Sequence, residues 1–255
     1  MRRRTKDQVL TELPPKIEQT VEVELSPKHQ RIYQTQLQRQ RQKVLGLVGN
    51  VQQQRFEILK SLTILRQLSL DPGLVDPADD HVGSAKLDRL EEDLLQVLAE
   101  GHRALVFSQF TRYLARVRER LDRAGVAHAY LDGKTRDRAG AIERFTSGEV
   151  PVFVISLKAG GFGLNLTHAD YCFVLDPWWN PAAETQAVDR AHRIGQVNPV
   201  VVYRYVATDT IEEKVMELKA RKSALFDQVV DADGALAGAL SEADLRGLFD
   251  LPGSA

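Results

Sequence analysis

Short apolar runs alternate with amphipathic stretches from residue 85 onward, and this alternation is the strongest pattern in the chain. Between the runs, apolar residues recur every three or four positions, as in the stretch that begins at Thr135 and contains Ile142 and Phe145. Short strands separated by helices indicate βαβ units and a parallel sheet. Continuous apolar runs are typical of strands that are covered on both faces. The pattern predicts an α/β domain over residues 85–206, with strands RALVFS, HAYLDG, PVFVIS, YCFVLD and PVVVYRYV.

Residues 1–84 follow a different pattern. LPPKIEQTVEVEL is extended, with alternating apolar positions after two prolines. Two helices are expected next, the first with Ser26 as its N-cap and the second from Asn50 to just before DPG. Residues 71–84 are rich in Pro, Gly and Asp and are interpreted as a linker. We therefore expect a mostly helical attachment.

The C-terminal end is expected to contain one long helix over residues 210–230, which braces the domain. Its apolar residues have helical spacing. The following residues, 231–255, are mainly small and are expected to form a flexible tail. The predicted organisation is an attachment (1–84), an α/β lobe (85–206), a brace helix (207–230) and a tail (231–255).

Composition sets limits on function. One cysteine, Cys172, excludes a disulfide framework, and the six histidines show no ligand spacing, so no metal site is expected. No run of about 18 apolar residues is present, and MRRRTKDQVL lacks the apolar part of a secretory signal. Residues 1–60 contain 12 Lys and Arg against 6 Asp and Glu, whereas residues 207–255 contain 5 against 10. The basic end is the better candidate for facing phosphates.

The segment YLDGKT resembles the end of a phosphate-binding P-loop but is incomplete. The position of the first required glycine holds His128, so the glycine turn that surrounds a phosphate is absent. A turn in which Thr135 caps the next helix is the favoured interpretation. No Asp-Glu pair ends an apolar strand to hold Mg²⁺. The chain alone is therefore not expected to assemble a nucleoside triphosphatase site.

Three further segments are candidates for binding. In SLKAGGFGLNL, glycines follow a strand end, where parallel sheets bind ligands, and a plain turn is an equally good interpretation. In DPWWNP, Trp178 and Trp179 cannot both point inward, so one is expected at a surface or interface. In QAVDRAHRIGQ, Arg190 and Arg193 are three residues apart, which places both guanidinium groups on one helical face. The alternative for that segment is an ordinary ion pair between Asp189 and Arg193.

Together these segments closely resemble the C-terminal RecA-like lobe of Swi/Snf-family DNA-translocating ATPases, within helicase superfamily two. VFSQF (106–110) resembles the family's fourth motif, SLKAGGFGLNLTHADYCFVLDPWWNP its fifth and QAVDRAHRIGQ its sixth. YLDGKTRDRAGAIERF resembles the family segment that follows the fourth motif, and RRTKDQVLTELPPKIE resembles the stretch that joins the two lobes. The resemblance thus implies that residues 1–84 hold the interlobe connection and a helical protrusion. The ending RIGQ favours this family over DEAD-box RNA helicases. The resemblance implies a RecA-like parallel sheet with helices on both faces, a helical protrusion and a brace helix.

The resemblance also implies roles for individual residues. Arg190 and Arg193 match arginine fingers that stabilise the transferring γ-phosphoryl group. Positions implied near ATP are Gly163, Asn165, Gln186 and Asp189. Positions implied on the face that follows a DNA backbone are Ser108, Lys134, Arg136, Ser156, Lys158, Gly160, Gly161 and Trp178.

The implied cofactor is ATP, with Mg²⁺ held mainly by a first lobe that supplies the P-loop and is not in this sequence. The implied partners are double-stranded DNA, that first lobe in the same polypeptide and a DNA-bound target protein. The chain is thus expected to be a monomeric part of a longer cytoplasmic bacterial protein, or a nuclear one if its source is eukaryotic. Two alternatives stay open: a non-catalytic DNA- or protein-binding module that kept the fold, and the lobe of an RNA helicase.

Overall fold

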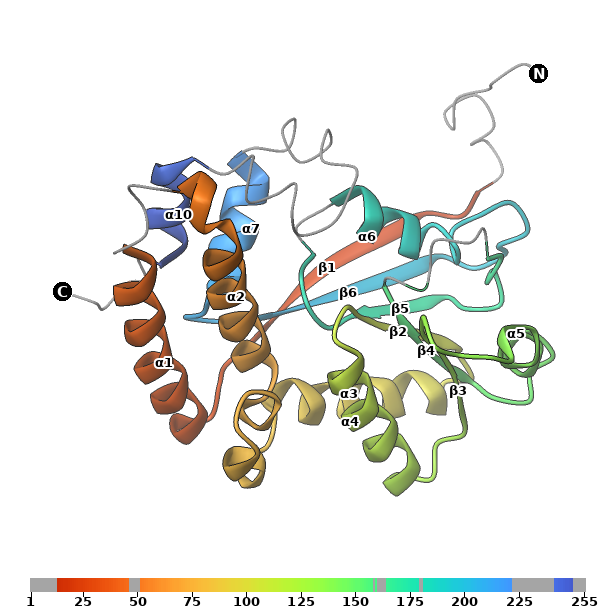
Figure 1. The fold of residues 1–255 in the computed structure, drawn as a ribbon. Coiled ribbons are helices and arrows are strands. Elements are labelled where there is room, and N and C mark those ends of the chain that lie inside the picture. Colours follow the sequence, from red (N-terminus) through yellow and green to blue (C-terminus); the bar gives the residue numbers. More distant parts are fainter. Residues whose placement is uncertain are drawn as a thin grey trace, which may run out of the picture.

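The computed structural model describes residues 13–45, 51–157, 159, 164–178, 181–221 and 241–249 (Figure 1). Its centre is a six-stranded sheet in which every described pairing is parallel, in the order β1-β6-β5-β2-β4-β3. The predicted parallel α/β fold is confirmed. The strands are β1 (Lys16–Val23), β2 (Ala104–Ser108), β3 (His128–Leu131), β4 (Val152–Ser156), β5 (Tyr171–Val174) and β6 (Val200–Ala207).

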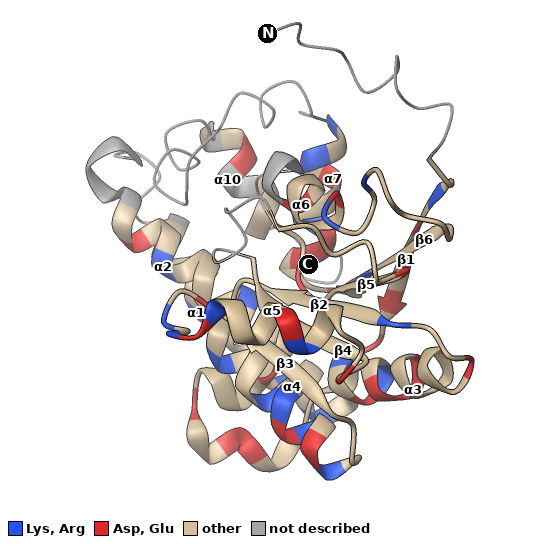
Figure 2. Ribbon diagram, turned by 90° about the vertical axis from the view of Figure 1, so that its right-hand side faces the viewer, with Lys and Arg blue, Asp and Glu red and all other residues tan. Residues whose placement is uncertain are grey.

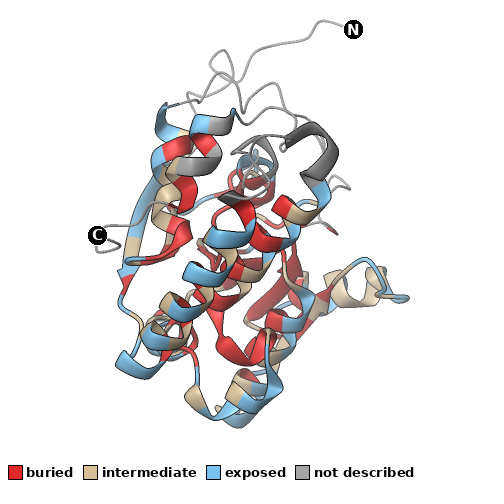
Figure 3. Ribbon diagram, turned by 60° about the vertical axis from the view of Figure 1, so that its left-hand side comes forward, coloured by how far each residue is buried: buried red, intermediate tan, exposed pale blue. Residues whose placement is uncertain are grey.

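Helices cover both faces of this sheet, so the inner strands are buried on both sides (Figure 3). Alternate residues of a strand face opposite layers: Val106 packs in the layer of α3 (Ala85–Ala99) and α4 (Thr111–Arg123), whereas Leu105 packs in the other. The second layer contains α5 (Arg138–Thr146) and α6 (Pro181–Val188). Every residue of β2 and β4 is buried, which explains their continuous apolar runs.

Strand β1 belongs to the sheet of the lobe. It pairs with β6 along its full length, from Lys16 opposite Val200 to Val23 opposite Ala207. The extended conformation was predicted from the alternating pattern, but the assignment of all of residues 1–84 to an attachment does not hold for this strand. The attachment proper consists of α1 (Pro27–Leu45) and α2 (Val51–Leu70), which lie side by side at the carboxyl ends of the strands (Figure 1). We call these two helices the helical protrusion.

The expected linker at residues 71–84 is ordered. It forms two short 3-10 helices, η4 (Pro72–Leu74) and η5 (Pro77–Val82), each capped by an aspartate. The carboxylate of Asp71 accepts a hydrogen bond from the Gly73 N–H at 2.8 Å. Arg116 of α4 forms ion pairs with both Asp71 and Asp80. Prolines and aspartates that suggested a loop here act as helix starts and caps.

Two predicted helix boundaries differ from the structure. Helix α5 begins at Arg138 and is capped by Asp137, whose carboxylate accepts the Gly140 N–H at 2.8 Å. Thr135 does not cap this helix, because its hydroxyl is bonded to Asp132 instead. Helix α6 ends at Val188, so it stops short of both arginines of QAVDRAHRIGQ.

The C-terminal end contains α7 (Ile211–Arg221) and a further helix, α10 (Glu242–Phe249). Ile211, Val215 and Leu218 are buried, as expected for a brace helix, while the predicted continuation of the helix to residue 230 lies outside the described residues. The expectation of a flexible tail is wrong for residues 241–249. Leu248 and Phe249 are each 1% exposed and belong to the same core cluster as α1 and α7. The sequence did not indicate this helix because its burial depends on contacts with distant helices.

No helix in the described part of the chain is long and apolar enough to cross a membrane.

Replacing Leu248 with alanine should therefore lower the free energy of unfolding by about 2–5 kcal/mol, the usual range for a buried leucine. Urea denaturation measures the change. Deleting residues 251–255, which follow α10, is the control and should leave the midpoint within experimental error. A Leu248→Ala protein with the midpoint of the unmodified chain would show that α10 adds nothing to the core.

Candidate functional site

The two arginines of QAVDRAHRIGQ lie in tight turns that follow α6. After Val188 the regular four-residue spacing of the helix is lost: the Val188 carbonyl accepts both the Ala191 N–H at 3.0 Å, a three-residue bond, and the His192 N–H at 3.3 Å, a four-residue bond. The turns are held against the segment that precedes β5, because the carbonyl of Arg190 accepts the Leu166 N–H at 2.9 Å. The expected single helical face is therefore replaced by a turn with a fixed path.

Arg190 is a buried cation, 7% exposed. Its Nη1 atom is buried and has no hydrogen-bond partner among the residues that the structure describes. Burial and the neighbouring charge of Arg193 together lower the pKa of Arg190 to about 10. A buried charge costs free energy unless an anion or hydrogen-bond acceptor compensates it. The site therefore favours an anionic ligand at Arg190.

Arg193 lies beside Arg190 but is exposed to solvent. Its Nη1 atom is 3.5 Å from the carbonyl oxygen of Leu164, at the limit of a hydrogen bond. Asn165 and Gln186 are also exposed, and Asp189 is half-buried. Gly163 lies outside the described residues. Arg190 is thus buried, whereas the side chain of Arg193 is exposed to solvent.

Gln196 fixes the shape of this turn, a role that its residue type alone does not indicate. Its side chain is 5% exposed, and both atoms of its amide group form hydrogen bonds. Nε2 donates to the carbonyls of Ala169 and Ala191, and Oε1 accepts the N–H groups of Val197 and Asn198. Gly195 has φ of 103°, a conformation that side chains disfavour. The glycine allows the turn, and the glutamine holds it in place.

The same turn is attached to the start of β1. Nε2 of His192 is 2.7 Å from the carbonyl oxygen of Pro14, and the Val200 N–H donates to the Pro15 carbonyl at 3.0 Å. Residues nearly 180 positions apart are thereby held together. The arginines consequently lie where the described chain enters the sheet.

A second group of predicted residues lies on the loop after β3. The carboxylate of Asp132 accepts hydrogen bonds from the Lys134 N–H and the Thr135 hydroxyl, both at 2.9 Å. Tyr130 donates its hydroxyl to the other oxygen of Asp132 at 3.0 Å. The loop is therefore preformed, with Lys134 and Arg136 both exposed. Elsewhere, basic and acidic residues are interspersed on most helices (Figure 2), whereas α1 carries Lys and Arg but no Asp or Glu.

The other residues predicted to contact DNA are divided between buried positions and positions outside the description. Ser108 and Ser156 end adjacent strands and are 0% and 2% exposed, and the Ser108 hydroxyl oxygen accepts the Phe110 N–H at 3.1 Å. Trp178 was expected at a surface, but it is 8% exposed and packs in the core. The two serines are turned inward at strand ends that are covered from both faces, whereas Trp178 follows the end of β5 and packs in the core cluster of the α5 and α6 layer. Lys158, Gly160, Gly161 and Trp179 lie outside the described residues.

Comparison with known proteins gives two family matches that together span most of the chain. A model described as the helicase conserved C-terminal domain matches residues 85–195, and one described as an SNF2-related domain matches residues 1–74. An uncharacterized ATP-dependent helicase of Mycoplasma pneumoniae is 34% identical over 97% of this chain and 24% of its own length. The chain spans about a quarter of the length of such curated relatives.

Two solved structures from Sulfolobus solfataricus have the same fold. The C-terminal domain of its SWI2/SNF2 ATPase has a TM-score of 0.70 and 28% identity, covering 92% of this chain and 99% of that one. The core of that ATPase in complex with double-stranded DNA has a TM-score of 0.75 and 29% identity, covering 97% of this chain and 53% of that one.

Proposed function

Because this chain belongs to the SNF2 family of helicase-like ATPases and has the fold of their C-terminal lobe, we propose that it is the second motor lobe of an ATP-dependent double-stranded DNA translocase. The observation that supports this most directly is the pair of arginines after α6. Arg190 is buried with an unsatisfied Nη1, and Arg193 extends from the same rigid turn. Such a pair suits a phosphate that another part of the polypeptide brings.

In this proposal the two arginines act as fingers on the γ-phosphoryl group of ATP. An arginine finger stabilises charge that develops on the phosphoryl oxygens in the transition state. Asn165, Gln186 and Asp189 line the nucleotide side of the turn, and Gly163 stays a proposed nucleotide-binding residue. The P-loop and the main Mg²⁺ ligands belong to a first lobe of the same polypeptide, since the sequence of this chain lacks the P-loop glycine turn.

The turn also offers an apolar surface to that first lobe. Ile194 is 74% exposed and Val197 is 82% exposed, on either side of the exposed Gly195 and the buried Gln196. Large apolar side chains that are rigidly displayed next to charged residues are typical of a protein contact. Closure of the two lobes on ATP would cover these side chains and bring Arg193 to the phosphate.

The DNA surface of the proposed lobe includes the loop of Lys134 and Arg136. Exposed cations on a preformed loop suit the phosphate backbone, which carries no sequence information. Lys158, Gly160 and Gly161 stay proposed members of this surface. The double-stranded DNA complex of the Sulfolobus ATPase core supports a DNA substrate over RNA.

ATP hydrolysis by the complete two-lobe protein, with and without double-stranded DNA, tests this function. Hydrolysis should rise with DNA, and this chain alone should hydrolyse no more ATP than a buffer blank. Hydrolysis that DNA leaves unchanged would favour the alternative, a binding module that kept the fold.

This chain should bind double-stranded DNA weakly and without sequence preference, with a Kd in or above the non-specific range of about 10⁻⁴–10⁻⁶ M. Replacing both Lys134 and Arg136 with alanine should reduce the slope of log K against log salt by about one for each lost phosphate contact. Fluorescence anisotropy over a salt series measures this slope.

A control for the loss of charge is the replacement of Arg89 and Arg123, which lie on α3 and α4 and contact other residues of their own helices. That variant has the same net charge and should keep the slope of the unmodified chain. Equal slopes for all three proteins would exclude the loop from the DNA surface.

A further inference from the structure

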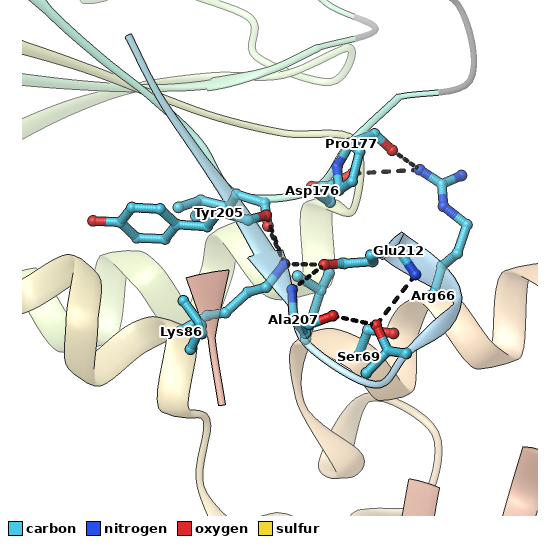
Figure 4. A network of polar contacts seen from close by, with 12 residues as sticks. Arg66, Ser69, Lys86, Asp176, Pro177, Tyr205, Ala207 and Glu212 are labelled. Carbon is cyan, nitrogen blue, oxygen red and sulfur yellow. Dashed lines mark hydrogen bonds and ion pairs between the residues drawn. The ribbon is translucent and has the colours of Figure 1, made fainter. Parts of the chain in front are cut away.

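Buried polar groups hold the segment Asp176–Trp178 from two sides, and neither contact was indicated by the sequence. This segment follows β5 and leads into α6, the helix that precedes the arginines. One contact comes from α2 of the helical protrusion, through Arg66 (Figure 4). The other comes from α6 itself, through Glu184.

Arg66 is 3% exposed and donates hydrogen bonds to two segments that follow strands. Its Nη2 atom donates to the Pro177 carbonyl at 2.6 Å, and its Nη1 atom donates to Oε1 of Gln109 at 3.1 Å. The guanidinium group also lies 3.8 Å from the carboxylate of Asp176 and 5.6 Å from the ring centre of Phe110. One side chain of the protrusion thus joins the end of β2 to the end of β5.

Gln109 and Asp176 complete this side of the cluster. Nε2 of Gln109 donates to Oδ2 of Asp176 at 2.6 Å, and the Gln109 backbone N–H points at the same carboxylate at 3.3 Å. Asp176 is 0% exposed and Gln109 is 9% exposed. Charged groups that are removed from water and bonded in several directions have one favoured arrangement, because each lost bond leaves a buried polar atom unpaired.

Glu184 makes the contact on the other side. Its carboxylate accepts the Trp178 N–H at 3.3 Å and pairs with Arg204 of β6 and with Lys219 of α7, the latter at 3.2 Å. Burial would raise the pKa of Glu184, but Lys219 and Arg204 hold it below its usual value. The carboxylate is therefore charged near neutral pH and links α6 to the segment before it.

We propose that Arg66 and Glu184 are positioning residues: through Asp176–Trp178, the position of the helical protrusion sets the position of α6 and of the two arginines after it. This inference rests on the proposed function of those arginines. Movement of α2 relative to the sheet would pull on the Pro177 carbonyl, and the Trp178 N–H would pass the displacement to Glu184. Neither residue touches ATP or DNA in this mechanism.

The test uses the complete two-lobe protein with saturating double-stranded DNA. Arg66→Ala should lower kcat at least tenfold and leave KM for ATP within about threefold, because misplaced fingers lose an interaction made only in the transition state. Arg66→Lys keeps the charge without the planar fork that reaches two acceptors, so it should recover part of kcat. It also provides a second variant if alanine prevents folding.

Leu62→Ala separates positioning from a loss of stability. Leu62 lies on α2 one turn before Arg66 and is 1% exposed, so its truncation destabilises the protrusion without touching Asp176–Trp178. Below the melting temperature of both variants, Leu62→Ala should keep kcat within twofold of the unmodified protein. If Leu62→Ala and Arg66→Ala lower kcat equally at equal loss of Tm, Arg66 has only a packing role.

A double-mutant cycle tests the connection between the two residues. If Arg66 and Glu184 act through one path, combining Arg66→Ala with Glu184→Ala should lower kcat no further than the more impaired single variant. Glu184→Gln replaces Glu184→Ala in the cycle if the alanine variant fails to fold because Arg204 and Lys219 have lost their partner. If the fold-loss in kcat of the double variant equals the product of the fold-losses of the two single variants, the residues act independently and the proposed connection is wrong. Failure here is distinct from failure of the proposed function, because DNA-stimulated hydrolysis that depends on Arg193 would still be observed.

Discussion

Replacing Arg193 with alanine in the complete two-lobe protein should lower DNA-stimulated ATP hydrolysis by about 10³–10⁵-fold, the range that an arginine finger contributes. This corresponds to about 4–7 kcal/mol of activation free energy. The side chain is exposed on a turn fixed by Gln196, so its removal should leave the fold of the lobe intact. Its guanidinium is needed once the lobes close on ATP.

The alternative role of Arg193 predicts a much smaller effect. A surface ion pair with Asp189 would contribute roughly 0.2–0.5 kcal/mol to stability and nothing to the rate. Arg193→Lys should restore little activity, because an ammonium group lacks the fork that contacts two oxygens. Arg123→Ala, at the far end of α4, is the control and should keep full turnover. An Arg193→Ala protein that retains more than about a tenth of the turnover, a loss below about 1.4 kcal/mol, would assign the arginine to structure.

The second large effect concerns the buried pair formed by Lys86 and Glu212. Lys86 is 0% exposed and donates to Glu212 and to the carbonyls of Leu175 and Tyr205 at 2.8 and 3.0 Å (Figure 4). Glu212 also accepts the Ala207 N–H at 2.8 Å. Burial lowers the pKa of Lys86 and raises that of Glu212, and each charge opposes the shift of the other. The pair thus joins α3 and α7 at the ends of β5 and β6.

Lys86→Met should lower the free energy of unfolding by about 3–5 kcal/mol, because it leaves the buried carboxylate of Glu212 without its counter-charge. Adding Glu212→Leu should recover part of the loss, since the double variant has no buried charge at this position. Recovery should be incomplete, because the Leu175 and Tyr205 carbonyls and the Ala207 N–H lose the hydrogen bonds that Lys86 and Glu212 make to them.

Urea denaturation of the two variants measures these free energies. Lys214→Met is the matched control: it lies on α7 and pairs with Glu217 at the surface, where an ion pair contributes about 0–1 kcal/mol. A Lys86→Met protein as stable as the Lys214→Met protein would show that the buried pair is not a structural link.

The sequence by itself determined the class of the fold and the identity of the candidate arginines. Continuous apolar runs identified β2 and β4 because both faces of those strands are covered, and a run of this kind is visible without knowing what covers it. Alternating apolar residues likewise identified β1 as extended. The motif QAVDRAHRIGQ placed Arg190 and Arg193 together because they are only three residues apart.

Only the tertiary structure decided what lies against each of these elements. The pairing of β1 with β6 and the contact of Arg66 with Pro177 join residues that are more than 100 and up to nearly 200 positions apart. The burial of α10 likewise brings together helices from opposite ends of the chain. A local pattern reports that a face is buried but not which partner buries it. The same limit applies to polar groups: Gln196, Trp178 and Ser108 are ordinary residue types whose orientation depends on hydrogen bonds and packing set by the whole fold. The roles of single residues at the site therefore required the structure, whereas the fold class required only the period of the apolar positions.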